Sequence, residues 1–234
     1  MGEEIELSIV IPTYNEKTRI ARTLDAYLAF YERTGLGYEI IVADYSSDGS
    51  KELIRDYEAR VGKVRLLDIT ERGKGLAVYH GFAAARGELI GFTDADNATP
   101  PEEFYKIVEA ARGDDSAIGS RGLGRSNVVH YNQSLFRRFG SLVLDLLFVR
   151  LMFGLRISDT QCGAKVFRRG KLMPILPAMR IKNSIFDVEL LWRFSKVGGI
   201  REVPIRWTDD KFSHFKWTET LDEAYWLLRV RLGV

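Results

Sequence analysis

The sequence has little of several features that would narrow its class at once. Its 234 residues include one cysteine, three histidines and six prolines, and the net charge is only +2. A single cysteine, Cys162, excludes an internal disulfide and is compatible with a reducing compartment. The near balance of charge gives no reason to expect nucleic-acid binding. The histidines, His80, His130 and His214, lack the spacing of metal ligands, so we expect structural roles for them.

Long hydrophobic runs are also missing. The most apolar segment, residues 142–155, is interrupted by Asp145 and Arg150, whereas a spanning helix needs about 20 predominantly apolar residues. The first residues, MGEEIELSIVIP, place acidic side chains before a short apolar run, unlike a signal peptide. We therefore expect a chain that does not cross a membrane. No linker-like stretch divides it, so residues 1–234 are predicted to form one domain.

What the sequence does contain is a regular alternation of apolar runs and helical patterns. Strands are predicted at residues 7–11, 39–43, 64–68, 88–92 and 116–120, and helices at 17–33, 49–60, 74–86 and 101–112. Such alternation indicates right-handed βαβ units. The predicted fold class is α/β, with a mainly parallel sheet covered by helices.

The most informative stretch is GELIGFTDADNATPPE, residues 87–102, in which an apolar run ends in Asp94-Ala95-Asp96. Two carboxylates spaced i and i+2 at the end of a strand project to the same side. There they can hold one divalent cation, Mg²⁺ or Mn²⁺, against a diphosphate. An isolated Asp-x-Asp is also common in exposed turns, so the neighbouring motifs decide the interpretation.

Two further polar clusters follow predicted strands: residues 12–16, Pro-Thr-Tyr-Asn-Glu, and residues 44–49, Asp-Tyr-Ser-Ser-Asp-Gly. Ligands of open α/β sheets bind beyond the carboxyl ends of strands, so we expect the three clusters to converge there. For single residues, helix capping by Asn15 or Ser50, or a turn at Asp48-Gly49, remains the alternative.

The segment Arg72-Gly73-Lys74-Gly75 opens the third predicted helix. It lacks the spacing of an ATPase phosphate-binding loop. Lys74 beside free backbone N–H groups at a helix start is a candidate for binding a nucleotide phosphate or base, and an exposed basic loop is the alternative.

Taken together, IVIPTYNE, VADYSSDGS, ERGKGLAVYHGFAAARGELIGFTDAD and SDTQCGAKVFRR resemble the inverting family-2 glycosyltransferases of the GT-A fold, from residue 7 to about residue 231. Within them the chain is most similar to the polyprenyl-phosphate sugar synthases. DADNAT, DTQCG and FDVELL point to the dolichyl-phosphate β-glucosyltransferases among these. The resemblance implies a Rossmann-like domain, with a nucleotide-sugar-binding half over about 1–120 and an acceptor-binding half with amphipathic helices over about 121–234.

The same resemblance implies roles for individual residues. The expected nucleotide-sugar-binding residues are Pro12, Tyr14, Asn15, Glu16, Asp44, Lys74, Asp94 and Asp96. Asp94 and Asp96 are also the expected ligands of Mg²⁺ or Mn²⁺, and Asp96 is expected to be catalytic. Asp187 is the candidate for the position that carries the base in polymer-forming members. Because a lipid phosphate is already anionic, both a base and an orienting role stay open for Asp187.

The acceptor phosphate is expected at Arg121, Arg137 and Ser141. Arg137 and Ser141 are four residues apart and would share one helix face. A solvated basic face is the alternative.

Two positions depart from the pattern of the family. Its usual Asp-Asp-Gly-Ser is here Ala43-Asp44-Tyr45-Ser46, with a bulky ring in place of glycine. The glutamine that helps hold the metal in mannose synthases corresponds to Ala98. These two departures therefore affect the nucleotide preference and the metal coordination expected from the family.

The predicted reaction is the transfer of a hexose, glucose from UDP-glucose, onto dolichyl or another polyprenyl phosphate. GDP-mannose as the donor is the first alternative. A polysaccharide or protein glycosyltransferase and a non-catalytic sugar-nucleotide-binding regulator are the others.

Residues 135–155 and 225–232 combine apolar, aromatic and arginine residues, a pattern typical of helices at a bilayer interface and equally of buried core helices. We expect a cytoplasmic protein, peripherally associated with the cytoplasmic face of a membrane. A membrane-anchoring partner or a homo-oligomer stays open.

Overall fold

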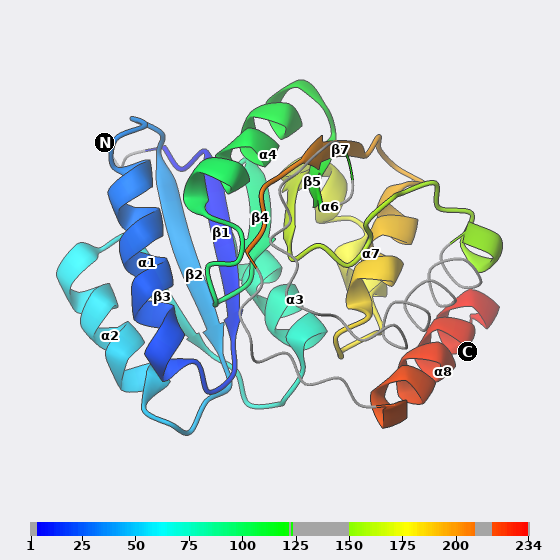
Figure 1. Cartoon of the computed structure of the whole chain (residues 1–234), viewed down its shortest axis with the longest axis horizontal. Helices are drawn as coiled ribbons and strands as arrows, with labels where there is room; N and C mark the ends of the chain where they lie inside the picture. Colours follow the sequence, from blue (N-terminus) through cyan, green and yellow to red (C-terminus); the bar gives the residue numbers. More distant parts are fainter. Residues whose placement is uncertain (1–3, 122, 124–149, 209–216, 234) are drawn as a thin grey trace.

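The computed structural model describes residues 4–121, 123, 150–208 and 217–233. A seven-stranded sheet has helices on both faces (Figure 1). Its strands are β1 Leu7–Thr13, β2 Tyr38–Asp44, β3 Val64–Asp68, β4 Leu89–Thr93, β5 Ser116–Ser120, β6 Ala164–Arg168 and β7 Arg201–Pro204. The helices are α1 Lys17–Tyr31, α2 Ser50–Val61, α3 Lys74–Ala84, α4 Pro101–Gly113, α6 Arg169–Leu172, α7 Phe186–Phe194 and α8 Trp217–Leu232, and a short 3₁₀ helix spans Leu176–Ala178.

The strand order is β3-β2-β1-β4-β6-β5-β7. Pairing is parallel throughout except at β6, which runs antiparallel to both β4 and β5. The predicted α/β class with a mainly parallel sheet is thus confirmed. The β6 strand was not predicted from the sequence, where residues 164–168 stand out only as part of the motif SDTQCGAKVFRR.

Alternate residues of each central strand enter two different cores. Ile9 and Ile11 of β1 pack with α1, α2 and α4 on one face, whereas Val10 packs with α3 and α7 on the other. All three side chains are completely buried. Burial on both faces explains why the central strands read as continuous apolar runs rather than as alternating ones.

The register places the carboxyl ends of the central strands at one edge. Thr13, the last residue of β1, pairs with Asp44, the last residue of β2, and β4 runs parallel on the other side of β1. The three polar clusters follow directly, as predicted from the general position of ligands in open α/β sheets.

The second half extends this frame through β6, α7 and β7. Helix α7 packs on the face that also holds α3, and α8 packs against α7. Among the described helices, none combines the length and apolarity needed to cross a bilayer.

Candidate active site

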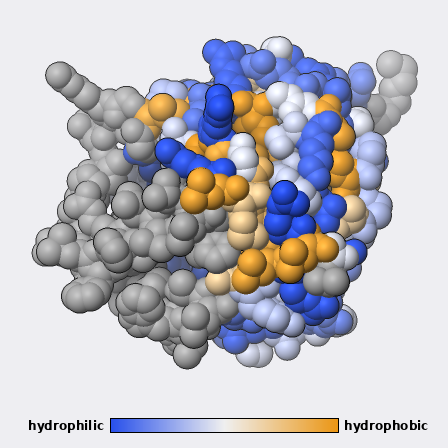
Figure 2. Space-filling model, turned by 90° about the vertical axis from the view of Figure 1, so that its right-hand side faces the viewer, coloured by the Kyte–Doolittle hydropathy of each residue, from blue (hydrophilic) through white to orange (hydrophobic). Residues whose placement is uncertain are grey.

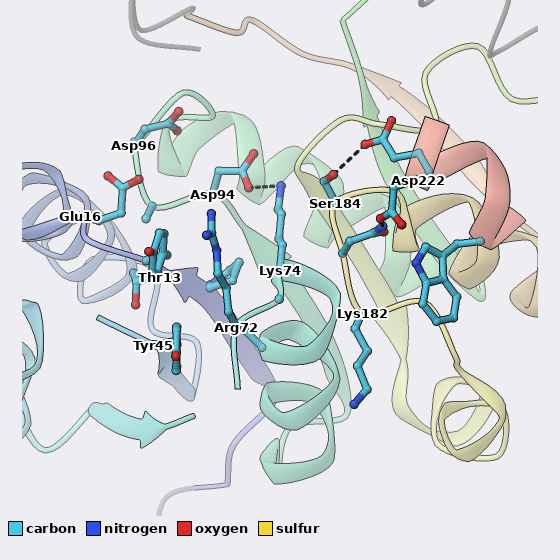
Figure 3. Close-up of a pocket in the computed structure, with 18 residues that line it drawn as sticks. Thr13, Glu16, Tyr45, Arg72, Lys74, Asp94, Asp96, Lys182, Ser184 and Asp222 are labelled. Atoms are coloured by element: carbon cyan, nitrogen blue, oxygen red, sulfur yellow. Dashed lines mark hydrogen bonds and ion pairs between the residues drawn. The ribbon is translucent and has the colours of Figure 1, made fainter. Parts of the chain in front are cut away.

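A cavity of about 720 Å³ opens at the carboxyl edge of the sheet (Figure 3). Three groups of residues line it. The aromatic wall consists of Tyr14, Tyr45 and Arg72; the charged wall consists of Lys74, Asp94 and Asp96; the far wall consists of Asn183, Ser184, Asp222, Glu223 and Trp226. In Figure 3, Tyr45 lies at one end, Lys74 and Asp94 in the middle, and Ser184 and Asp222 at the other end.

The charged wall begins where β4 ends. The Lys74 ammonium lies 2.7 Å from Asp94 Oδ1, and Asp96 Oδ1 accepts a 2.9 Å hydrogen bond from the backbone N–H of Ala98. Asn97 adopts a positive φ of 59° in this turn. Asp94 and Asp96 thus both face the cavity, as their i, i+2 spacing predicted.

Burial and neighbouring charges shift the pKa values of Asp96 and Lys74. Burial and the negative charge of Asp94 raise the pKa of Asp96 above its ordinary value. Burial alone would lower the pKa of Lys74, but the attraction of Asp94 and Asp187 outweighs it and holds that pKa above the ordinary range. Lys74 therefore carries a positive charge at neutral pH, beside the carboxylates of Asp94 and Asp96 in the cavity.

Gly163, in the DTQCG segment, supports Asp94 from behind. A Cβ atom at residue 163 would overlap the Asp94 carboxylate. Only a residue without a side chain leaves room for Asp94 at this position, and nothing in the spacing of the two segments indicated this contact.

Two tyrosine rings form most of the aromatic wall. Their centroids are 6.0 Å apart and their planes differ by 15°, and the Arg72 guanidinium lies 4.4 Å from the centroid of the Tyr14 ring. Tyr14 is 44% exposed and Tyr45 is 37% exposed. Such accessible, nearly parallel faces can stack on a planar base.

Asp44 and Asn15 lie behind the aromatic wall rather than in it. The completely buried Asp44 carboxylate accepts hydrogen bonds from the Thr13 hydroxyl and from both the backbone N–H and the hydroxyl of Ser46. The Asn15 side chain accepts one from the backbone N–H of Ser47 at 3.1 Å, instead of capping α1. Both residues tie the ends of β1 and β2 together and so position Tyr14 and Tyr45.

The start of α3 requires a correction. The backbone N–H groups beside Lys74 are not free, because Gly75 N–H donates to Asn183 O at 3.2 Å and Leu76 N–H donates to Lys182 O at 3.1 Å. A Cβ atom at Gly75 would lie 2.6 Å from Phe186 Cβ. The glycine therefore permits close packing of the second half on α3, and it is the side chain of Lys74 that faces the cavity.

The far wall was not predicted from the sequence. Asn183 Nδ2 donates a 3.0 Å hydrogen bond to Asp222 Oδ2, and the Ser184 hydroxyl donates a 2.8 Å bond to Glu223 Oε1. These bonds join the segment before α7 to α8. The partners are 39 residues apart in the chain, so only the tertiary fold brings them together.

Asp187 lies outside the cavity lining. It is buried, and its Oδ1 is 2.6 Å from Nζ of the completely buried Lys165, which also donates to the Cys162 carbonyl. Burial raises the pKa of Asp187, and Lys165 and Lys74 oppose that rise. The carboxylate is thus held in a fixed ion pair close behind the charged wall.

The predicted acceptor residues fall into two groups. Arg121 forms a two-point ion pair with Asp159, at 2.7 and 2.8 Å, and its guanidinium lies 5.1 Å from the Trp207 ring centroid. It does not line the cavity. Arg137 and Ser141 lie outside the described residues.

The charged wall fits a hard divalent cation only with help from a ligand. Within the described part of the chain, no group of three or more acidic, histidine or cysteine side chains could hold a metal. Mg²⁺ is commonly held by one or two carboxylates together with substrate phosphates and water. Asp94 and Asp96 supply those carboxylates, so the donor set fits Mg²⁺ or Mn²⁺ bound jointly with a diphosphate.

The sequence of residues 8–175 matches the family model described as "Glycosyl transferase family 2". The chain belongs to this family. Its glycosyltransferase relatives include "Dolichyl-phosphate beta-glucosyltransferase" of Drosophila melanogaster, 36% identical over 223 residues that cover 88% of this chain and 68% of that protein. The protein of the same name from Saccharomyces cerevisiae is 34% identical over 230 residues, covering 88% of this chain and 67% of that one. The predicted family-2 glycosyltransferase is confirmed.

Solved structures share the fold of this glycosyltransferase. Mannosyl-3-phosphoglycerate synthase from Rubrobacter xylanophilus superposes with a TM-score of 0.70 at 17% identity, over 97% of this chain and 73% of that one. Glucosyl-3-phosphoglycerate synthase from Mycobacterium tuberculosis, in complex with Mn²⁺, UDP and glucosyl-3-phosphoglycerate, gives 0.67 at 19% identity over 98% and 81%. At these identities the similarity establishes the fold alone.

Proposed function

We propose that this family-2 glycosyltransferase transfers glucose from UDP-glucose to dolichyl phosphate or a related polyprenyl phosphate. The observation that carries the proposal is the cavity in which Lys74, Asp94 and Asp96 lie between an aromatic wall and a polar far wall. Relatives called "Dolichyl-phosphate beta-glucosyltransferase" in the fly, in yeast and in Homo sapiens support the choice of sugar and acceptor.

The donor would lie along the cavity. Its base would stack on Tyr14 and Tyr45, and its diphosphate would meet the Lys74 ammonium beside Asp94. Glucosyl-3-phosphoglycerate synthase, which shares the fold, was solved with UDP and Mn²⁺, in line with a uridine donor. GDP-mannose remains the second candidate, because a mannosyl-transferring enzyme shares the fold as well.

Asp94 and Asp96 would hold a Mg²⁺ or Mn²⁺ ion, which supplies charge neutralisation at the departing diphosphate. Lys74 adds a second positive charge at the same place, since its Nζ lies 2.7 Å from Asp94 Oδ1. Stabilising the leaving group in this way lowers the barrier without any proton transfer.

The acceptor phosphate would attack C1 of the sugar from the side opposite the leaving group and invert its configuration. This nucleophile is already anionic, so the main task of the protein is to position it. Arg121, fixed by Asp159, together with Arg137 and Ser141, is proposed to hold that phosphate. Asp187, paired with Lys165, would orient the site rather than take a proton.

A lipid acceptor requires access to a membrane surface. On α8, Tyr225, Leu228 and Leu232 are exposed next to Arg229 and Arg231. The side of the molecule that carries α8 in Figure 1 faces the viewer in Figure 2, where hydrophobic and hydrophilic residues lie side by side. Such a surface suits peripheral binding to an anionic bilayer, which we propose to be a cytoplasmic one.

Transfer from radiolabelled UDP-glucose and GDP-mannose to dolichyl phosphate, in detergent with Mn²⁺, tests the function. We expect a labelled lipid from UDP-glucose, and loss of that product in Asp96→Ala. Product from GDP-mannose alone would correct the donor. Absence of a lipid product from both donors, despite nucleotide binding, would contradict the acceptor.

A further inference from the structure

We propose that the far wall is the hexose subsite of the donor, with Asp222, Glu223 and Trp226 contacting the sugar. This inference rests on the proposed function only in assuming a nucleotide-sugar donor. Neither the sequence motifs nor the names of the relatives assign a role to these three residues.

The order of the walls along the cavity indicates where the sugar of the donor would lie. The aromatic wall suits a base and the charged wall suits a diphosphate, and the far wall lies beyond the charged wall (Figure 3). A nucleotide sugar has the same linear order of base, diphosphate and hexose. A donor that occupies the first two walls therefore places its sugar next to Asp222 and Ser184.

The chemistry of the far wall matches an uncharged polyol. Carboxylate oxygens accept hydrogen bonds from hydroxyl groups, and charge-assisted bonds of this kind are stronger than neutral ones. The Trp226 indole supplies an apolar face for the C–H side of a sugar ring. Asp222 and Glu223 would repel a second phosphate, and the nearby Lys182 is held 3.1 Å from Glu71 Oε2.

Hydrogen bonds also fix the position of the far wall relative to the charged wall. The carbonyl groups of Lys182 and Asn183 accept hydrogen bonds from the first turn of α3, next to Lys74. The side chains of Asn183 and Ser184 then fix Asp222 and Glu223 on α8. Hydrogen bonds thus link the first turn of α3, which carries Lys74, to the residues that would meet the sugar.

The test compares binding of a nucleotide sugar with binding of its free nucleotide diphosphate. Calorimetry with Mn²⁺ and without lipid would use UDP-glucose and UDP, with GDP-mannose and GDP in parallel. We expect Trp226→Ala and Asp222→Ala to weaken nucleotide-sugar binding roughly tenfold. Binding of the free diphosphate should change by less than about twofold, because it does not reach the far wall.

Val197→Ala is the control, because Val197 is an exposed apolar residue that does not line the cavity. It should leave both affinities unchanged, whereas Asp222→Asn should give an intermediate loss for the nucleotide sugar.

Three results would overturn the inference alone: no change for either ligand, equal losses for both, or a raised KM for polyprenyl phosphate with unchanged nucleotide-sugar binding. A wild-type protein that binds no nucleotide diphosphate would instead contradict the proposed function and the inference together.

Discussion

The two ends of the cavity are built in different ways. At the aromatic and charged walls, the tyrosines and the aspartates follow the strands β1, β2 and β4, and Arg72 and Lys74 lie at the start of α3. Short local sequence motifs indicate all of them. At the far wall, Asn183 and Asp222 meet only through a tertiary hydrogen bond. Local sequence thus determines the aromatic and charged walls. The far wall depends instead on how the second half of the chain packs against the first.

We expect the largest effect of a substitution at the buried ion pair of Asp187 and Lys165, behind the charged wall. Asp187→Asn leaves the Lys165 ammonium buried without its carboxylate, which typically costs about 3–5 kcal/mol of stability. We expect turnover to fall more than nucleotide binding, measured by transfer assay and calorimetry.

The double variant Asp187→Asn with Lys165→Met separates the two roles of this pair. It should regain stability in urea unfolding but not activity, if Asp187 orients the site. A double variant with full turnover would show that Asp187 serves the fold alone.

Gly75→Ala tests the docking of the second half. The added methyl group would overlap Phe186 Cβ and the Ile181 carbonyl, and overpacking of this kind costs about 1–3 kcal/mol. Chemical unfolding should detect the loss. Gly113→Ala, where a Cβ meets nothing within 4 Å, is the matched control. Equal stability of the two variants would contradict the tight contact.

Tyr45→Ala tests the aromatic wall, at the opposite end of the cavity from the far wall. Loss of one stacking face should weaken binding of a nucleotide diphosphate about tenfold, since stacking on a base is worth about 1–3 kcal/mol. Tyr45→Phe keeps the ring and should bind normally, as titration calorimetry would show. Normal binding by the alanine variant would place the base elsewhere.

The smallest effect concerns the pH dependence of stability in the first half. Burial alone would raise the pKa of Glu39, but hydrogen bonds from Arg86 and Ser8 outweigh it and hold that pKa below its usual range. A lowered pKa in the folded state means that this stabilisation is present above pH 4.5, the usual pKa, and is lost as the pH falls further.

Urea unfolding between pH 7 and pH 3 checks this expectation. The acid-induced loss of stability should be smaller in Glu39→Gln than in the wild type. Glu88→Gln, at an exposed carboxylate, should follow the wild type. An unchanged slope in Glu39→Gln would contradict the assignment.

Much of the frame could be predicted from sequence, because periodicity and turn residues act locally. The run predicted at residues 39–43 is the core of β2, Tyr38–Asp44, and the helix predicted at 101–112 is α4, Pro101–Gly113. The convergence of the strand ends followed from the general behaviour of parallel sheets.

The failures share a physical cause, which is contact between distant segments. Free N–H groups were predicted beside Lys74, whereas the N–H groups of Gly75 and Leu76 donate hydrogen bonds to carbonyl groups more than a hundred residues later in the chain. For Asp187, both a base and an orienting role stay predictions, and its ion pair with Lys165, 22 residues away in the chain, was not predicted. Trp226 was not predicted to line a cavity, because the pattern of residues 225–232 fitted a helix at a bilayer interface and a buried core helix equally well.

The contact between the start of α3 and the 181–186 segment limits how this protein can be divided or recombined. A fragment that ends after β5 would leave Gly75 and Leu76 without their hydrogen-bond partners. It would also uncover Phe82, which packs on Phe167 of β6. Exchange of segments between relatives should therefore transfer residues 72–76 and 181–186 as one unit, although more than a hundred residues separate them.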